Sequence, residues 1–160
     1  MRKYNILFVC HGNICRSPMA EFIFKDLAAK KGLSQNCFAC SAATSSEEIG
    51  NPVYPPAAAE LKRNGIVGFG SKRAVKLKKS DYDDYDLIIG MDRENMYNMR
   101  RLFDGDPEDK LRLLMDFTPI RGEVSDPWYT GDFKRAFNDI YAGVSGLFDF
   151  LSISVIRKTD

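Results

Sequence analysis

Residues 10–17, which read Cys-His-Gly-Asn-Ile-Cys-Arg-Ser, form a short loop between two recognisable secondary-structure patterns. The preceding residues 6–9 are a continuous apolar run, typical of a strand that is buried on both faces. Ser17 and Pro18 are residue types that cap a helix and occupy its first position, and a helix is predicted over residues 19–30. A buried strand joined by a tight loop to a helix predicts the opening unit of an α/β sheet.

Strand and helix patterns continue to alternate along the rest of the chain. We predict further strands at residues 37–43, 86–90 and 111–115, and further helices at residues 55–61, 93–102 and 133–151. Such alternation predicts a parallel sheet with helices on both faces. No linker, low-complexity tract or internal repeat interrupts the pattern, so we expect one domain over residues 1–160, a three-layer α/β sandwich.

The composition is that of an ordinary soluble globular protein, with 160 residues, 44% apolar, 28% charged and a net charge of +1. This charge gives no global reason to expect nucleic acid or an anionic membrane as a partner. No apolar run approaches the roughly 20 residues that span a bilayer, and residues 6–9 are too few for a secretion signal. Four cysteines are too few for a disulfide scaffold, so we expect a cytoplasmic protein with free thiols.

The loop combines residue types that suit a bound phosphate. A loop leading into a helix supplies backbone N–H groups and the positive end of the helix dipole, and Gly12 and Asn13 tolerate a left-handed backbone. Arg16 adds a planar guanidinium that can bind two phosphate oxygens. The same positive field favours the nucleophilic thiolate of Cys10, and Ser17 can hydrogen-bond its sulfur. The alternative is that Cys10 is only a small buried residue and Arg16 a surface residue.

Cleavage of a phosphate ester also needs a group that protonates the leaving oxygen. Asp126 is the best candidate, because it lies in a long loop and is followed by a proline that fixes the backbone. Trp128 and Tyr129 beside it suit a slot for an aryl phosphate. The alternative is that Asp126 is a turn residue and the two aromatic residues anchor the loop.

These residues resemble the low-molecular-weight protein tyrosine phosphatases over nearly the whole chain. Residues 9–18 resemble the phosphate loop of that family and residues 126–129 its general-acid loop, with further matches at residues 41–45, 50–66 and 86–92. The resemblance implies a four-stranded parallel sheet flanked by helices, a monomer and no cofactor. It implies a phosphotyrosine protein or a small aryl phosphate as substrate, with phosphate as product and competitive inhibitor.

The resemblance also implies roles for individual residues. Cys10 attacks phosphorus, and Asp126 first protonates the leaving phenolate and then activates the hydrolytic water. Asn13, Ser17 and Ser41 match positions that brace the loop. Cys15 matches a second cysteine that can form a reversible disulfide with Cys10, the alternative being a buried thiol.

The chain departs from the family pattern around the substrate pocket. Lys72 stands where many members have a histidine of the bracing network, and Glu47 where animal enzymes often have an aromatic pocket wall. His11, the only histidine, follows the nucleophile at a position that tunes substrate choice, or is simply a loop residue. Ile14 favours phosphotyrosine, since the phosphoarginine branch of the family carries threonine there. The expected pocket comprises His11, Gly12, Asn13, Ile14, Cys15, Ser17, Glu47, Trp128 and Tyr129.

Other functions fit less well. An arsenate reductase would need two more cysteines near residues 80–90, where the chain has none. Cys37 and Cys40 resemble half of a zinc site without a second half, so we expect no metal and a structural role for both. A module that only binds phosphotyrosine needs neither a nucleophile nor an acid.

The basic cluster at residues 72–79 is interpreted as a solvated edge, and the acidic run at residues 81–86 as a polar turn.

Overall fold

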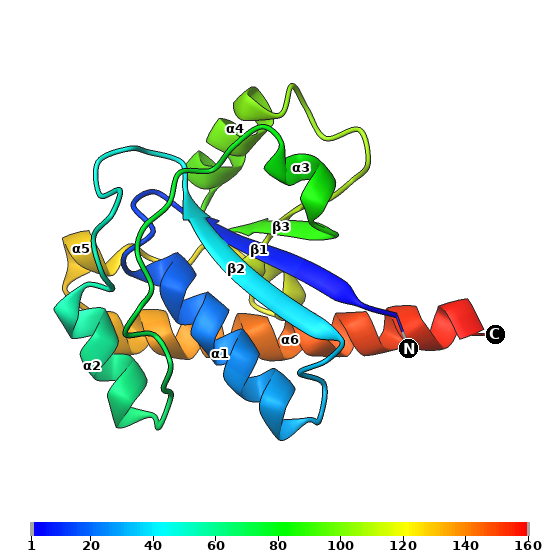
Figure 1. The fold of residues 1–160 in the computed structure, drawn as a ribbon, viewed down its shortest axis with the longest axis horizontal. Coiled ribbons are helices and arrows are strands. Elements are labelled where there is room, and N and C mark those ends of the chain that lie inside the picture. The colour runs from blue at the N-terminus through cyan, green and yellow to red at the C-terminus, as the bar shows by residue number, and fades with distance from the viewer. Residues whose placement is uncertain (1, 160) are drawn as a thin grey trace.

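One parallel sheet organises the molecule, in a computed structural model that describes the backbone of residues 2–159 and the side chains of residues 2–152. Its strand order is β2-β1-β3-β4 (Figure 1), with β1 at Tyr4–Cys10, β2 at Cys37–Ala43, β3 at Leu87–Gly90 and β4 at Leu111–Leu113. The pairs are all parallel, and Cys10 pairs with Ala43 while Val9 pairs with Gly90. The carboxyl ends of the three longer strands therefore meet at one edge, directly below the loop that follows Cys10. This confirms the four-stranded parallel sheet.

Helices cover both faces of the sheet. Successive residues of β1 point to opposite sides, so both faces carry apolar side chains that the helices bury. Helices α1 (Arg16–Lys30), α2 (Pro55–Arg63) and α6 (Phe133–Thr159) lie on one side, and α3 (Asp81–Asp84) and α4 (Arg93–Leu102) on the other (Figure 1). Ile6 and Phe8 belong to the larger apolar cluster, whereas Leu7 and Val9 belong to the smaller one. The three-layer α/β sandwich predicted from the alternating pattern is thus confirmed.

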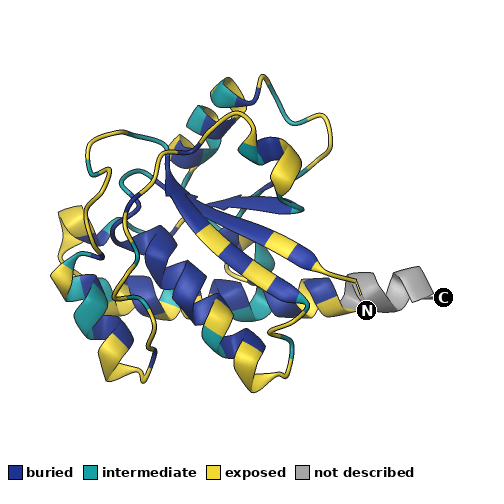
Figure 2. Cartoon of the chain, in the orientation of Figure 1, coloured by how far each residue is buried: buried dark blue, intermediate teal, exposed yellow. Residues whose placement is uncertain are grey.

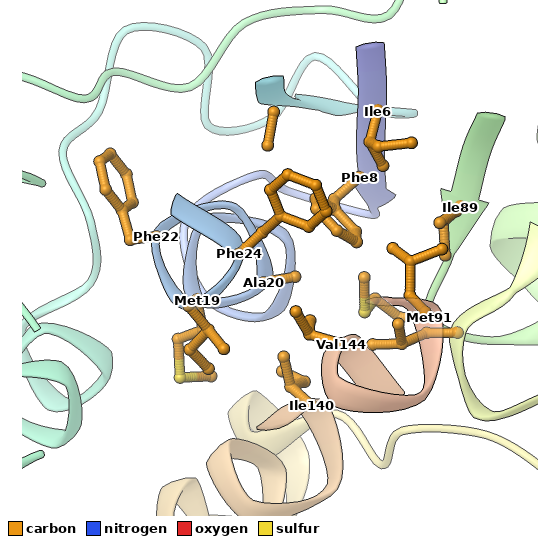
Figure 3. Packing of buried hydrophobic residues seen from close by; sticks show 14 of the residues in the cluster. Ile6, Phe8, Met19, Ala20, Phe22, Phe24, Ile89, Met91, Ile140 and Val144 are labelled. Carbon is orange, nitrogen blue, oxygen red and sulfur yellow. The ribbon is translucent and has the colours of Figure 1, made fainter. Parts of the chain in front are cut away.

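The larger cluster is built around the aromatic side chains of α1 (Figure 3). The Phe24 ring stacks on Phe148 of α6 at a centroid distance of 4.5 Å and meets the edge of Phe8 at 5.9 Å. Figure 2 shows that exposed residues of β1 and β2 lie toward the amino ends of these strands, while the carboxyl ends are buried. The phosphate loop predicted after β1 therefore begins at the buried end of that strand.

Several element boundaries differ from those predicted. Helix α1 begins at Arg16 after Cys15, so Ser17 is not its cap, because the Ser17 hydroxyl is engaged by Cys10 and Asn13 instead. Strand β4 is shorter than predicted, since residues Leu114–Phe117 form a 3-10 turn, η1. A helical turn, α3, replaces the expected polar turn, and α6 runs to Thr159 rather than residue 151. No helix in the described part of the chain is both long and apolar enough to cross a bilayer.

We expect Gly146→Ala to lower the free energy of unfolding by about 1–3 kcal/mol, through overpacking. A methyl group on Gly146 would overlap the Phe117 carbonyl oxygen and lie 2.9 Å from its carbon, so α6 and η1 would have to separate. Urea denaturation measures the change. Gly70→Ala is the control, because no atom lies within 4 Å of the added methyl group and its φ lies outside the left-handed region. Equal midpoints for the two variants would contradict the prediction.

Candidate active site

The loop at residues 10–17 is held in shape by its carbonyl groups. The carbonyl oxygens of Cys10 and His11 accept hydrogen bonds from the N–H groups of Thr44 and Ser45, and that of Ile14 accepts one from Tyr54. These carbonyls therefore bind neighbouring segments and do not face a bound anion. Asn13 adopts a left-handed φ of 60°, as predicted.

Gly12 can also tolerate a left-handed backbone, but in the structure it does not adopt one. Its lack of a side chain matters for a different reason. A Cβ atom on Gly12 would lie 3.4 Å from Cγ of Glu48, in close van der Waals contact. Glycine therefore lets the aliphatic stem of Glu48 lie close against the loop.

The sulfur of Cys10 lies in a polar cradle although the residue is only 3% exposed. The Asn13 backbone N–H donates to Sγ over 3.3 Å, and the Ser17 hydroxyl lies 3.0 Å from it. Asn13 Nδ2 donates to Ser17 Oγ over 2.8 Å, which leaves the Ser17 proton free to point at the sulfur. Two donors aimed at one sulfur stabilise its anionic form.

A buried polar network holds these donors from behind. Asn13 Nδ2 also donates to Ser41 Oγ, and Ser41 in turn donates to Glu21 Oε1 over 2.6 Å. Lys25 donates to Glu21 over 2.6 Å, which balances the charge of this buried carboxylate. The backbone N–H of Val75 donates to Asn13 Oδ1, and this bond fixes the orientation of the amide. Ser41 was predicted from the sequence, whereas Glu21 was not, because its position inside α1 carries no local signal.

Lys72 joins the same network. The interpretation of the basic cluster as a solvated edge is therefore wrong for this residue. Its ammonium donates to the Ser41 carbonyl oxygen over 3.0 Å and lies 3.8 Å from Glu21. Burial lowers the pKa of Lys72, and the charge of Glu21 opposes that effect. Lys72 therefore lies within the network that braces the loop, at the position where the resemblance placed a histidine in many family members.

Arg16 is buried, so it is not a surface residue. Its Nη1 donates to Asp92 Oδ2 over 2.8 Å and to the Val124 carbonyl oxygen over 2.9 Å, and its Nη2 lies 3.4 Å from Asp126 Oδ2. Burial lowers the pKa of Arg16, but the charges of Cys10, Asp92 and Asp126 outweigh it and raise that pKa above its usual value. The guanidinium therefore stays charged and is fixed in orientation.

Asp92 was missed as a site residue. It caps α4 by accepting from the Asn95 N–H with one oxygen, which directs the other oxygen to Arg16. The pattern of Asp92 and Asn95 after a buried strand signals a capping box. Nothing in the local sequence indicates the arginine that the cap would hold.

Cys15 lies beside the site as a buried thiol. Burial raises its pKa to about 12, and the negative charges of Cys10 and Asp126 add to the effect. Cys15 is therefore protonated at neutral pH. All four cysteines are free thiols in this structure, with Cys37 buried and Cys40 exposed.

Asp126 precedes the helical turn α5 (Pro127–Thr130) and serves as its cap. Its Oδ1 accepts from the Trp128 N–H over 3.0 Å, which leaves Oδ2 on the side of Arg16. The Trp128 ring lies 5.0 Å from the Tyr54 ring, so α5 is braced against the segment before α2. The carboxyl group is thus held near the phosphate loop, and its side chain keeps 26% exposure.

A pocket of about 110 Å³ opens above the loop and gathers most of the predicted residues. Its lining includes Cys10, Arg16, Asp126, His11, Gly12, Ile14, Cys15, Glu47, Trp128 and Tyr129. Asn13 and Ser17 belong to the loop, but their side chains are buried, contact each other and do not line the pocket. Glu48 also lines the pocket and was missed, because nothing in the sequence distinguishes it from its neighbour Glu47.

Comparisons with known proteins match the chain along almost its full length. Residues 5–158 match the family described as low molecular weight phosphotyrosine protein phosphatase. The chain is 41% identical over 145 residues to the low molecular weight protein-tyrosine-phosphatase YfkJ of Bacillus subtilis, covering 89% of this chain and 92% of that one. It is 37% identical over 131 residues to a human low molecular weight phosphotyrosine protein phosphatase, covering 80% and 82% of the two chains.

Solved structures give the same similarity in three dimensions. The crystal structure of YfkJ superimposes with a TM-score of 0.92 at 38% identity, covering 96% of this chain and 98% of the other. Vibrio vulnificus Wzb in complex with benzylphosphonate superimposes with a TM-score of 0.78 at 25% identity, covering 91% and 97%. The likeness therefore extends over the sheet, the loop and the helices around it.

Proposed function

Because this chain belongs to the low molecular weight phosphotyrosine protein phosphatases, we propose that it hydrolyses phosphotyrosine in two steps, through a phosphoryl group carried on Cys10. One observation carries the proposal. The Cys10 sulfur, the Arg16 guanidinium and the Asp126 carboxyl group line a single pocket, and each is fixed by hydrogen bonds to its neighbours.

In the first step the Cys10 thiolate attacks phosphorus, and the bond between phosphorus and the phenolic oxygen breaks. Asp126 Oδ2 transfers its proton to that oxygen, so tyrosine leaves as a neutral phenol. Arg16 and the N–H groups at the start of α1 stabilise the equatorial phosphate oxygens, where charge accumulates. These groups stabilise the transition state effectively because they are already oriented before substrate arrives.

In the second step a water molecule attacks the phosphocysteine. Asp126, now ionised, accepts a proton from this water, and the bond between phosphorus and sulfur breaks. The Ser17 hydroxyl stabilises the departing thiolate through the 3.0 Å contact seen in the structure. Inorganic phosphate leaves and Cys10 and Asp126 return to their starting states, so no cofactor takes part.

The pocket favours a flat aryl group over a short alkyl chain. Trp128, Tyr129 and Ile14 line the pocket together with Glu47 and Glu48. Binding of benzylphosphonate by Vibrio vulnificus Wzb supports an aryl ligand with a phosphate-like head group. Because Cys10 must remain a free thiol to react, we place the enzyme in a reducing compartment such as the cytoplasm.

The test compares one peptide phosphorylated on tyrosine with the same peptide phosphorylated on serine. We expect kcat/KM for the phosphotyrosine peptide to be higher by about 100-fold or more, since a phenol leaves more easily and fills the pocket. Phosphate release under reducing conditions is the measurement. Equal rates for both peptides, or no release from either, would contradict the proposed function.

A further inference from the structure

Two adjacent carboxylates line the pocket, and the mechanism uses neither. Glu47 and Glu48, here called the acidic wall, line it together with Trp128 and Tyr129 of α5. They belong to the segment after β2, which is anchored at both ends. The Ser45 N–H donates to the His11 carbonyl oxygen, and the Gly50 N–H donates to the Ala74 carbonyl oxygen. The wall is therefore a fixed part of the site.

Both carboxylates are held in place by specific contacts. Asn51 Nδ2 donates to Glu48 Oε2 over 2.6 Å, and the stem of Glu48 lies against Gly12. His11 Nε2 lies 3.1 Å from Glu47 Oε2, within hydrogen-bond distance. The Glu47 side chain is nevertheless 70% exposed, so it remains free to meet a cation from solvent. An acidic wall held in this way presents its charge to whatever flanks the reacting phosphate.

The cations of the site do not cancel this charge. Among the described residues, Arg16 is the only arginine or lysine in the pocket lining, and it is already paired with Asp92 and Asp126. Lys72 is buried behind the loop against Glu21 and does not reach the mouth. His11 is the remaining basic group at the rim. The mouth is therefore acidic although the phosphate loop below it attracts an anion.

We propose that the acidic wall makes the enzyme select phosphotyrosine that is flanked by lysine or arginine and discriminate against phosphotyrosine flanked by acidic residues. This inference rests on the proposed function, since it names the substrate class of the same pocket. The phosphoryl group binds to the loop, and a neighbouring basic side chain binds to Glu47 or Glu48. An acidic neighbour meets two fixed carboxylates at short range, which weakens its binding.

The test uses two phosphotyrosine peptides of equal length, one with arginine and one with glutamate on both sides of the phosphotyrosine. We expect kcat/KM for the arginine peptide to exceed that for the glutamate peptide by about fivefold or more at low salt. The ratio should fall toward one in Glu47→Gln/Glu48→Gln and should shrink at high salt in the wild type. The ratio of the two kcat/KM values is the readout. Neutralising the wall also affects binding of the phosphate dianion, but this effect is common to both peptides.

Asp83→Asn is the matched control, since it removes one exposed carboxylate on α3, outside the pocket lining. It should leave the ratio unchanged. Turnover of p-nitrophenyl phosphate, which has no flanking residues, distinguishes failure of this inference from failure of the proposed function. If the wild type hydrolyses it but shows a peptide ratio near one, or if the double variant keeps the full ratio, this inference is wrong. If the wild type hydrolyses neither p-nitrophenyl phosphate nor the peptides, the proposed function fails and the inference with it.

Discussion

Cys10→Ser should lower the turnover of p-nitrophenyl phosphate by at least about 10⁴-fold, because a chain without its nucleophile retains only binding and electrostatic stabilisation. The serine hydroxyl is smaller than the thiol and remains protonated near neutral pH. Asn13 and Ser17, which contact the Cys10 sulfur, cannot make the hydroxyl a comparable nucleophile. Steady-state release of p-nitrophenol, with native and variant protein compared in reducing buffer, measures the loss.

Cys40→Ser provides the matched control, since it makes the same atomic change at an exposed position of β2. It should keep activity within about twofold of the native value, as surface substitutions usually do. Calorimetric titration with inorganic phosphate should show that Cys10→Ser still binds the anion, because Arg16 and the loop remain. Residual turnover of more than a few per cent in Cys10→Ser would assign the nucleophile elsewhere.

The phosphate loop was predictable from sequence because its parts are contiguous. A buried strand, a left-handed residue and a helix start occur within 15 residues of one another, and each has a local signature. Cys10, Asn13 and Arg16 could therefore be assigned before any long-range contact was known. Asp126 was identified from a different local feature, the aspartate before proline in a loop, together with the family resemblance.

The residues that hold this loop were harder to predict, because their partners are distant in the chain. Glu21 meets Ser41 and Lys72, and Asp92 meets Arg16 across 76 positions. A buried glutamate within a helix has the same sequence appearance as an exposed one. Burial, which decides its role, depends on the tertiary packing.

Local competition explains the wrong helix start at Ser17. Serine before proline is a common cap, but its hydroxyl here is used by the Cys10 sulfur and the Asn13 amide. The side chain cannot also cap the helix, so α1 begins at Arg16 without a side-chain cap. At this position the chemistry of the site overrides the usual sequence signal.

Asp126→Asn should reduce kcat for phenyl phosphate by about 10²–10⁴-fold, the usual contribution of a positioned general acid. Asparagine keeps the oxygen that accepts from the Trp128 N–H, so the cap of α5 should survive. The substitution replaces Oδ2 by an amide group that cannot transfer its proton to the leaving oxygen. Asp132→Asn is the control, because Asp132 also accepts a backbone N–H, that of Arg135, at the start of a helix.

The leaving group distinguishes proton transfer from positioning. p-Nitrophenolate leaves well without protonation, so the loss caused by Asp126→Asn should be at least about tenfold smaller for p-nitrophenyl phosphate than for phenyl phosphate. Asp126 also lies 3.4 Å from Arg16, and a role limited to orienting that guanidinium would act on both substrates alike. Equal losses for the two substrates would therefore make Asp126 a positioning residue for Arg16 and remove it from the proton-transfer step.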